Sequence, residues 1–107
     1  MAADVRDNPE KHRYEIHVDG ALAGVIDYEL GKDRIALLHT EIDDAFGGQG
    51  LGKVLVSGVL ADVRARGLAV RPFCPYVRRT IQRNPDDYLD LVRPEDRSEF
   101  DLPEEGQ

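Results

Sequence analysis

The chain has 107 residues, 41% of them apolar, which suits one domain with a single hydrophobic core and excludes barrel enzymes and most multidomain catalysts. No apolar stretch approaches the roughly 20 residues that a membrane-spanning helix requires, so we expect no membrane partner. The first ten residues contain acids and a proline but no apolar run, which argues against a secretory signal or transit peptide and favours a cytoplasmic protein. The single cysteine, Cys74, cannot form an intramolecular disulfide, in agreement with a reducing compartment.

The formal net charge of -7 is concentrated at the C-terminal end of the chain. From Asp86 onward there are nine acids and two arginines, whereas residues 53–83 hold seven basic side chains and one acid. We expect no nucleic-acid partner, but a locally positive surface able to attract a small polyanion; the alternative is a set of solvated helix faces. Residues 94–107 are acidic and contain prolines, so we predict a disordered tail after a single domain at residues 1–93.

Alternating apolar residues predict a strand at residues 14–18, and the Asp-Gly pair at 19–20 provides a tight turn. A second strand is predicted at residues 22–30, a turn at 31–33 and a third strand at 35–42. Consecutive strands joined by short turns predict an antiparallel meander.

The apolar period then changes to that of a helix, which Gly67 ends and which we expect to cover one face of the sheet. Its apolar face consists of Leu51, Leu55, Val59 and Val63. A fourth strand is predicted at residues 68–73, where proline limits pairing. Pro75 suits the first turn of a short helix that ends near Arg83, with Cys74 at or beside its N-cap, and a final turn or helix is predicted at residues 86–92.

Four glycines in the six residues 47–52 lie between the third strand and the long helix, where unpaired backbone N–H groups and the helix dipole favour an anion. The dinucleotide fingerprint G-x-G-x-x-G fails, because Lys53 or Leu55 stands at its last glycine. The nucleoside-triphosphate loop G-x-x-x-x-G-K-[ST] matches as far as Lys53, but Val54 replaces the hydroxyl that binds magnesium. A plain flexible turn is the structural alternative.

The pyrophosphate loop of the GNAT acyltransferases, [Q/R]-x-x-G-x-[G/A], fits this stretch with Gly50 and Gly52 at its small positions, although Gly47 replaces the first Gln or Arg. With its surroundings, the chain resembles a small single-domain branch of that superfamily over about residues 14–92. Three separated blocks carry the resemblance: His39-Thr40-Glu41-Ile42, the stretch from Phe46 to Gly52, and the Cys-Pro-Tyr-Val motif within Pro72 to Val77.

The resemblance implies an α/β protein with a minimal GNAT-like acyl-CoA N-acyltransferase fold, a mostly antiparallel sheet with a splayed strand pair and flanking helices. The gap between the splayed strands would admit the pantetheine arm of acetyl-CoA, the co-substrate, beside main-chain groups of Glu41 and Ile42. So short a chain leaves the acceptor side open. The residues expected to bind the pyrophosphate are Gly47, Gly48, Gln49, Gly50, Leu51, Gly52 and Lys53.

Cys74 stands where a strand ends and a helix begins, a position that favours a thiolate. The matching cysteine of the branch is regarded as catalytic, which implies the same here. Two roles stay open: a nucleophile that accepts the acetyl group, which we favour, or a general acid that protonates the departing CoA thiolate. The alternative is a buried cysteine that acts as a small hydrophobe.

His39 and Glu41 are two residues apart on one strand, so they share a face and can bracket a substrate amine and accept its proton, while Thr40 points the other way. A structural role for His39 is the alternative. Tyr76 is a candidate acid toward the thiolate, or a packing residue. His12 and His17 have no evident ligand spacing, so we expect no metal site.

These features together predict an N-acetyltransferase that transfers the acetyl group of acetyl-CoA to an unidentified amine, with a Cys74 thioester as one route. We expect a monomer or weak dimer. The rival prediction is a non-catalytic module that binds CoA or acyl-CoA, or that interacts with another protein.

Overall fold

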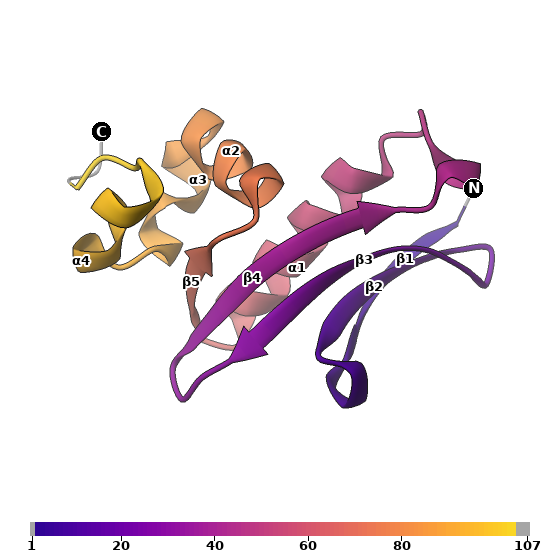
Figure 1. Ribbon diagram of the computed structural model, residues 1–107, viewed down its shortest axis with the longest axis horizontal. Helices are drawn as coiled ribbons and strands as arrows, with labels where there is room; N and C mark the ends of the chain where they lie inside the picture. Colours follow the sequence, from indigo (N-terminus) through magenta and orange to yellow (C-terminus); the bar gives the residue numbers. More distant parts are fainter. Residues whose placement is uncertain (1, 105–107) are drawn as a thin grey trace.

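The structure is a computed structural model and describes residues 2–104. It consists of one five-stranded sheet and four α-helices within that range (Figure 1). The strands are β1 (Ala3–Asn8), β2 (Arg13–Val18), β3 (Ala21–Leu30), β4 (Arg34–Ile42) and β5 (Ala69–Pro72). The α-helices are α1 (Leu51–Ala65), α2 (Pro75–Arg83), α3 (Pro85–Tyr88) and α4 (Pro94–Arg97). Short 3₁₀ turns lie at Pro9–Lys11, Asp44–Phe46, Leu89–Leu91 and Ser98–Phe100.

The strands follow one another across the sheet in the order β1-β2-β3-β4-β5. The first four form an antiparallel meander, and β5 returns parallel to β4 after the α1 crossover. The predicted meander is confirmed, because β2, β3 and β4 each begin within one residue of the expected position. The α/β fold class, with a mostly antiparallel sheet and flanking helices, is likewise confirmed.

Strand β1 was not predicted, since Val5 is its main apolar residue. It pairs with β2 along its whole length, from Ala3 opposite Val18 to Asn8 opposite Arg13. Its approach to α1 depends on Gly58, where an added Cβ would lie 3.0 Å from Cβ of Val5. Backbone pairing and this close contact with the helix therefore both contribute to holding the edge strand.

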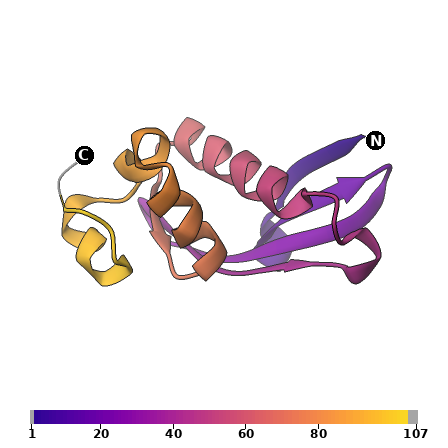
Figure 2. The ribbon, with the colours of Figure 1, turned by 90° about the horizontal axis from the view of Figure 1, so that it is seen from above.

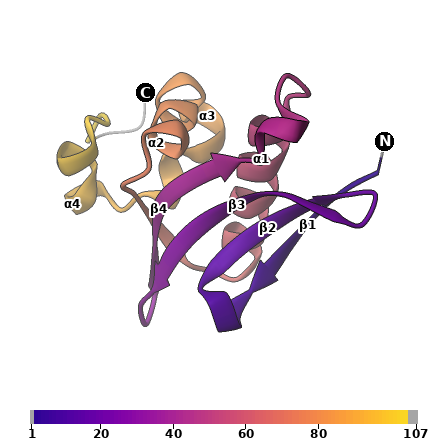
Figure 3. The same cartoon turned by 45° about the vertical axis from the view of Figure 1, so that its right-hand side comes forward.

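Helix α1 lies along one side of the sheet and covers the core (Figure 2). Its buried face consists of Leu51, Leu55, Val56, Val59, Leu60 and Val63. These side chains meet fully buried Ile16, Ile26, Ile35 and Leu37 from β2, β3 and β4. Burial of each large apolar side chain contributes about 1.5–3 kcal/mol to stability. Because these residues must face the core, their helical spacing in the sequence predicted α1 correctly. Seen from another side, the meander lies in front of the helices, and no helix of residues 2–104 covers its outer face (Figure 3).

A polar network ties the C-terminal half of α1 to the first three strands. Tyr14 donates to Asp62 at 2.5 Å, and Arg66 donates to the Tyr14 hydroxyl at 3.0 Å. Tyr28 donates to Asp7 at 2.6 Å, and Arg66 reaches the same carboxylate at 3.3 Å. Burial, reinforced by Asp7, raises the pKa of Tyr28 to about 12, and burial beside Asp62 also raises the pKa of Tyr14. Both phenols are therefore protonated hydrogen-bond donors at neutral pH.

The C-terminal segment differs from the prediction of a disordered tail. Residues 94–100 form α4 and a 3₁₀ turn, and Phe100 and Leu102 are 2% and 5% exposed. Arg97 donates to the carbonyl oxygens of Leu89, Val92 and Glu104, so one buried guanidinium satisfies three backbone acceptors. The segment is acidic, but these few residues anchor it. Residues 105–107 of the predicted tail lie outside the described residues.

Among the described residues, no helix has both the length and the apolar character that crossing a bilayer demands.

Candidate functional site

The glycine-rich loop leads into a helix whose N-terminus has no side-chain cap. Asp43 accepts a hydrogen bond from the N–H of Ala45 at 2.9 Å and so starts the turn that precedes the glycines. Gly48 and Gly50 then adopt φ values of 80° and 72°, in the left-handed region that favours glycine. Gly50 is the N-cap of α1 and supplies no capping side chain. The first amides of α1, aligned with the positive end of the helix dipole, are therefore suited to an anion.

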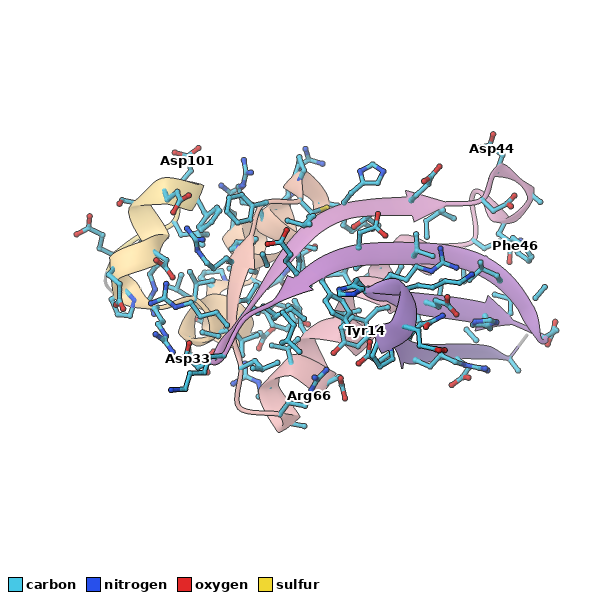
Figure 4. All side chains as sticks on the ribbon, turned by 60° about the horizontal axis from the view of Figure 1, so that its bottom comes forward. Tyr14, Asp33, Asp44, Phe46, Arg66 and Asp101 are labelled. Carbon is cyan, nitrogen blue, oxygen red and sulfur yellow. The ribbon has the colours of Figure 1, made fainter. Side chains whose placement is uncertain are left out.

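This loop lies at the end of β4 that is remote from the β3–β4 turn. Figure 4 shows Asp44 and Phe46 at the loop and Asp33 at the opposite end of the strand. Phe46 is half-buried and packs against the hydrophobic core, which fixes the start of the loop. The loop thus has an anchored entry, and glycines form its exit at the helix.

Strands β4 and β5 separate in the middle of β4, as the splayed pair was predicted to do. Their parallel pairing ends at Leu37 opposite Pro72, and the N–H of Cys74 donates to the Leu37 carbonyl at 2.8 Å. Beyond that point, residues 38–42 of β4 have no strand partner on this side among residues 2–104. Arg78 holds the diverging chain by donating to the carbonyl of Phe73 at 3.0 Å. The unpaired edge of β4 runs toward the glycine-rich loop.

Cys74 lies at the point of divergence. It is the N-cap of α2, and its side chain is 2% exposed. Its Sγ lies 3.0 Å from Oγ1 of Thr40 on β4, within hydrogen-bond distance. Of the nearby arginines, Arg71 instead pairs with Glu99 at 2.7 Å. The polar contact of the thiol is therefore a neutral hydroxyl on the neighbouring strand.

A β-bulge decides which β4 side chains face this thiol. Asp27 pairs with His39 and Tyr28 with Leu37, so Leu38 is the additional residue. The bulge places Thr40 on the helix side of the sheet, while His39 and Glu41 lie together on the outer face. Their Nε2 and Oε1 atoms are 3.9 Å apart, and the side chains are 64% and 73% exposed. The two candidate bases share a face, as predicted, but it is not the face of Cys74.

Tyr76 lies against the first turn of α1. A Cβ added to Gly52 would come within 3.0 Å of the Tyr76 hydroxyl, so glycine at this position permits the phenol to approach the helix. The ring is 41% exposed. The structure thus brings Tyr76 to the glycine-rich loop, a contact that no spacing rule indicated, because it joins two helices that are remote in sequence.

No sequence pattern indicated a role for Thr40, although alternation along the strand correctly placed it opposite His39. The missing information was which face of β4 meets the helices, and that depends on the bulge at Leu38. Residues 2–104 contain no group of three or more His, Cys, Asp or Glu side chains placed to bind a metal ion.

Comparisons with known proteins agree with this geometry. The profile of the family described as GCN5-related N-acetyl-transferase matches residues 13–91. Protein NATD1 of Xenopus tropicalis is 29% identical over 93 residues, which cover 84% of this chain and 85% of that protein. Protein NATD1 of Homo sapiens is 29% identical over 93 residues, which cover 84% of this chain and 82% of that protein. The solution structure of a GCN5-like protein from Staphylococcus aureus has a TM-score of 0.60 and 23% identity, covering 83% of this chain and 86% of that one, and it shares the fold.

Proposed function

Because its profile matches residues 13–91, this chain belongs to the GCN5-related N-acetyltransferase family, and we propose that it transfers the acetyl group of acetyl-CoA to an amine. One observation carries the proposal: from the point where β4 and β5 separate, the unpaired edge of β4 leads toward the uncapped N-terminus of α1. This arrangement supplies an unpaired strand edge that leads to an anion site. We also propose that the enzyme is a monomer or weak dimer located in the cytoplasm, where the single free thiol stays reduced.

The residues present fit acetyl-CoA at both ends of that arrangement. Amides of residues 47–53 would bind the pyrophosphate, because Gly48 and Gly50 have no side chain to keep a phosphate away and Lys53 adds positive charge. Main-chain groups of Glu41 and Ile42 on the unpaired edge would hydrogen-bond the amides of the pantetheine arm. Bound in this way, the co-substrate supplies an activated acetyl thioester near Cys74.

Cys74 would then act as the nucleophile. Its thiol would release its proton to solvent, and the sulfur would attack the thioester carbonyl carbon, so that a new carbon–sulfur bond forms while the bond to the CoA sulfur breaks and CoA leaves as a thiolate. The acceptor amine would then attack the carbonyl carbon of the Cys74 thioester, the carbon–sulfur bond would break, and the proton lost by the amine would balance the one that regenerates the Cys74 thiol. If Cys74 is instead a general acid, it donates its proton to the CoA thiolate while the amine attacks acetyl-CoA directly.

His39 and Glu41 would accept the proton of the amine from the outer face of the sheet, where both side chains reach solvent. Tyr76 would donate a proton to the departing thiolate from its place beside Gly52. The uncovered outer face leaves room for an acceptor of any size.

A second candidate, a module that binds CoA or acyl-CoA without turnover, is favoured by one observation. The thiol is buried on the helix side of β4, whereas the candidate bases lie on the other side. Loss of the acetyl-CoA thioester in the presence of polyamines, lysine peptides or arylamines separates the two functions. Binding without loss of the thioester supports the module.

Substitutions at Gly50 test the cofactor site. Gly50→Asn and Gly50→Asp have nearly the same shape, and both residue types tolerate the left-handed backbone better than other side chains. A carboxylate about 5 Å from a pyrophosphate costs on the order of 1–2 kcal/mol, so calorimetry should find CoA binding on the order of tenfold weaker for the Asp variant than for the Asn variant. Equal affinities would contradict the assignment of the loop.

Intact-mass spectrometry tests the covalent step. Cys74 is the single cysteine of the chain, so an acetyl thioester has one position to occupy. We expect an acetyl adduct after incubation with acetyl-CoA and none in Cys74→Ala. Absence of the adduct from the wild type, together with full activity of Cys74→Ala, would remove Cys74 from the chemistry.

A further inference from the structure

Helix α2 presents a basic face beside the N-terminus of α1. Tyr76, Arg79 and Arg83 recur at the spacing of one helix face, whereas Val77 and Ile81 are buried on the other. Together with one α1 residue, this face lines a pocket of about 430 Å³, a size typical of small-molecule sites. The lining residues are Lys53, Tyr76, Arg79, Thr80, Arg83 and Asn84.

The positive charge of this pocket is not neutralised within the described part of the chain. The three cations Lys53, Arg79 and Arg83 line it without any acid, and none of them forms an ion pair with another residue of 2–104. Arg79 and Arg83 are four residues apart on α2, where two like charges repel and destabilise a helix. An anionic ligand would relieve this repulsion, which makes the face suited to bind one.

A second, larger pocket among the described residues lacks this property. It has a volume of about 670 Å³ and lies between the C-terminal part of α1 and α3. Its arginines already have partners: Arg64 pairs with Asp90 at 2.6 Å, and Arg97 donates to backbone carbonyls. Size alone therefore does not identify the anion site, whereas uncompensated charge does.

The basic pocket adjoins the proposed pyrophosphate loop. Lys53 belongs to both, and Tyr76, which lines the pocket, lies against Gly52 of the loop. In CoA the ribose that follows the pyrophosphate carries a 3′-phosphate, a group with a charge of about -1.5 to -2 at neutral pH. A CoA molecule whose pyrophosphate is on the loop can therefore extend this phosphate toward Arg79 and Arg83.

We infer that the pocket binds the 3′-phosphorylated ribose of CoA through Arg79 and Arg83, so that the protein selects CoA thioesters over thioesters that lack this phosphate. The inference rests on the proposed function. Dephospho-CoA and the phosphopantetheine of a carrier protein both lack this phosphate, so their thioesters should be disfavoured as acetyl donors. The guanidinium groups supply charge-assisted hydrogen bonds to the phosphate oxygens.

Calorimetry with CoA and dephospho-CoA, which differ by the 3′-phosphate alone, tests the pocket. We expect the wild type to bind CoA about tenfold more tightly at low ionic strength, with a smaller ratio in high salt. Arg83→Gln should weaken CoA binding about tenfold and leave dephospho-CoA binding unchanged. Lys32→Gln is the matched control, because it removes one positive charge from the exposed β3–β4 turn and should change neither affinity.

Thermal unfolding separates this role from a structural one. Arg83→Gln relieves the repulsion from Arg79 but also removes a cation from the last turn of α2, so its melting temperature should stay close to that of the wild type while CoA binding weakens. Equal affinity of the wild type for CoA and dephospho-CoA would overturn the pocket assignment and leave the proposed function standing. An equal loss of both affinities in Arg83→Gln would also overturn it. Failure of the wild type to bind either compound would overturn the proposed function and the pocket with it.

Discussion

Replacement of Phe100 by alanine should destabilise the protein strongly, although the residue belongs to an acidic, proline-containing segment. The ring is 2% exposed and packs edge-on against Phe73, with centroids 5.0 Å apart. Arg71 lies over both rings, at 5.0 Å from the Phe73 centroid and 5.7 Å from that of Phe100. Loss of a buried phenylalanine costs about 3–5 kcal/mol. The lower value applies here, because Phe73 is 37% exposed and the site can partly collapse.

A loss of about 3 kcal/mol corresponds to a decrease of roughly 12 °C in melting temperature for a chain of this length. Calorimetry and urea denaturation measure the change, and Ser98→Ala, an exposed substitution in the same segment, is the matched control. Phe100→Ala should unfold well below the control, and a chain that ends at Arg93 should be at least as unstable. Identical unfolding of Phe100→Ala and Ser98→Ala would show that the segment does not pack and would restore the prediction of a disordered tail.

Three further substitutions test other parts of the molecule. Hydrogen bonds from His17 and Asn8 lower the pKa of Glu15 from 4.5 to about 2, so the ionised carboxylate stabilises the fold above pH 4.5. In urea denaturation, the wild type should therefore be more stable than Glu15→Gln at neutral pH. This difference in unfolding free energy should shrink as the pH falls from 4.5 to 2. Gly58→Ala should cost about 1 kcal/mol in the same assay, because its clash with the edge strand outweighs the gain in helix propensity; a net gain would contradict the placement of β1. Thr40→Val should slow acetyl transfer about fivefold to tenfold, and Thr40→Ser should restore it; equal rates for the two variants would remove the hydroxyl from the reaction.

The parts of the fold that sequence predicted are those encoded locally. Asp19-Gly20 marks a tight turn and Leu51 begins a helical period, and each signal lies within a few residues of the element that it specifies. Strand β1 has no such signal. Asp7 contributes through hydrogen bonds from Tyr28 and Arg66, partners that are remote in sequence, and Val5 contributes through its fit over a glycine of α1.

The C-terminal segment was misjudged for a related reason. Acidic and proline-rich composition predicts disorder when a segment has too little apolar surface to bury. Here Phe100 and Leu102 enter a core that the rest of the chain has already formed, and Arg97 satisfies carbonyls that would otherwise be buried without partners. Amino-acid composition does not show whether the folded core has space for the few apolar residues of such a segment.

The candidate site shows the same distinction within a single strand. Alternation along β4 places His39 and Glu41 together and Thr40 opposite, but an uninterrupted strand would also put His39 on the face of Leu37, which is buried in the core. The additional residue at the bulge moves each following side chain to the opposite face of the sheet, so that His39 is exposed and Thr40 lies toward Cys74. A base on the outer face can then reach an amine at the thiol only around the unpaired edge of β4. The splay of β4 and β5 therefore has two roles in the proposed reaction, since it admits the pantetheine arm and connects the two faces on which the reacting groups lie.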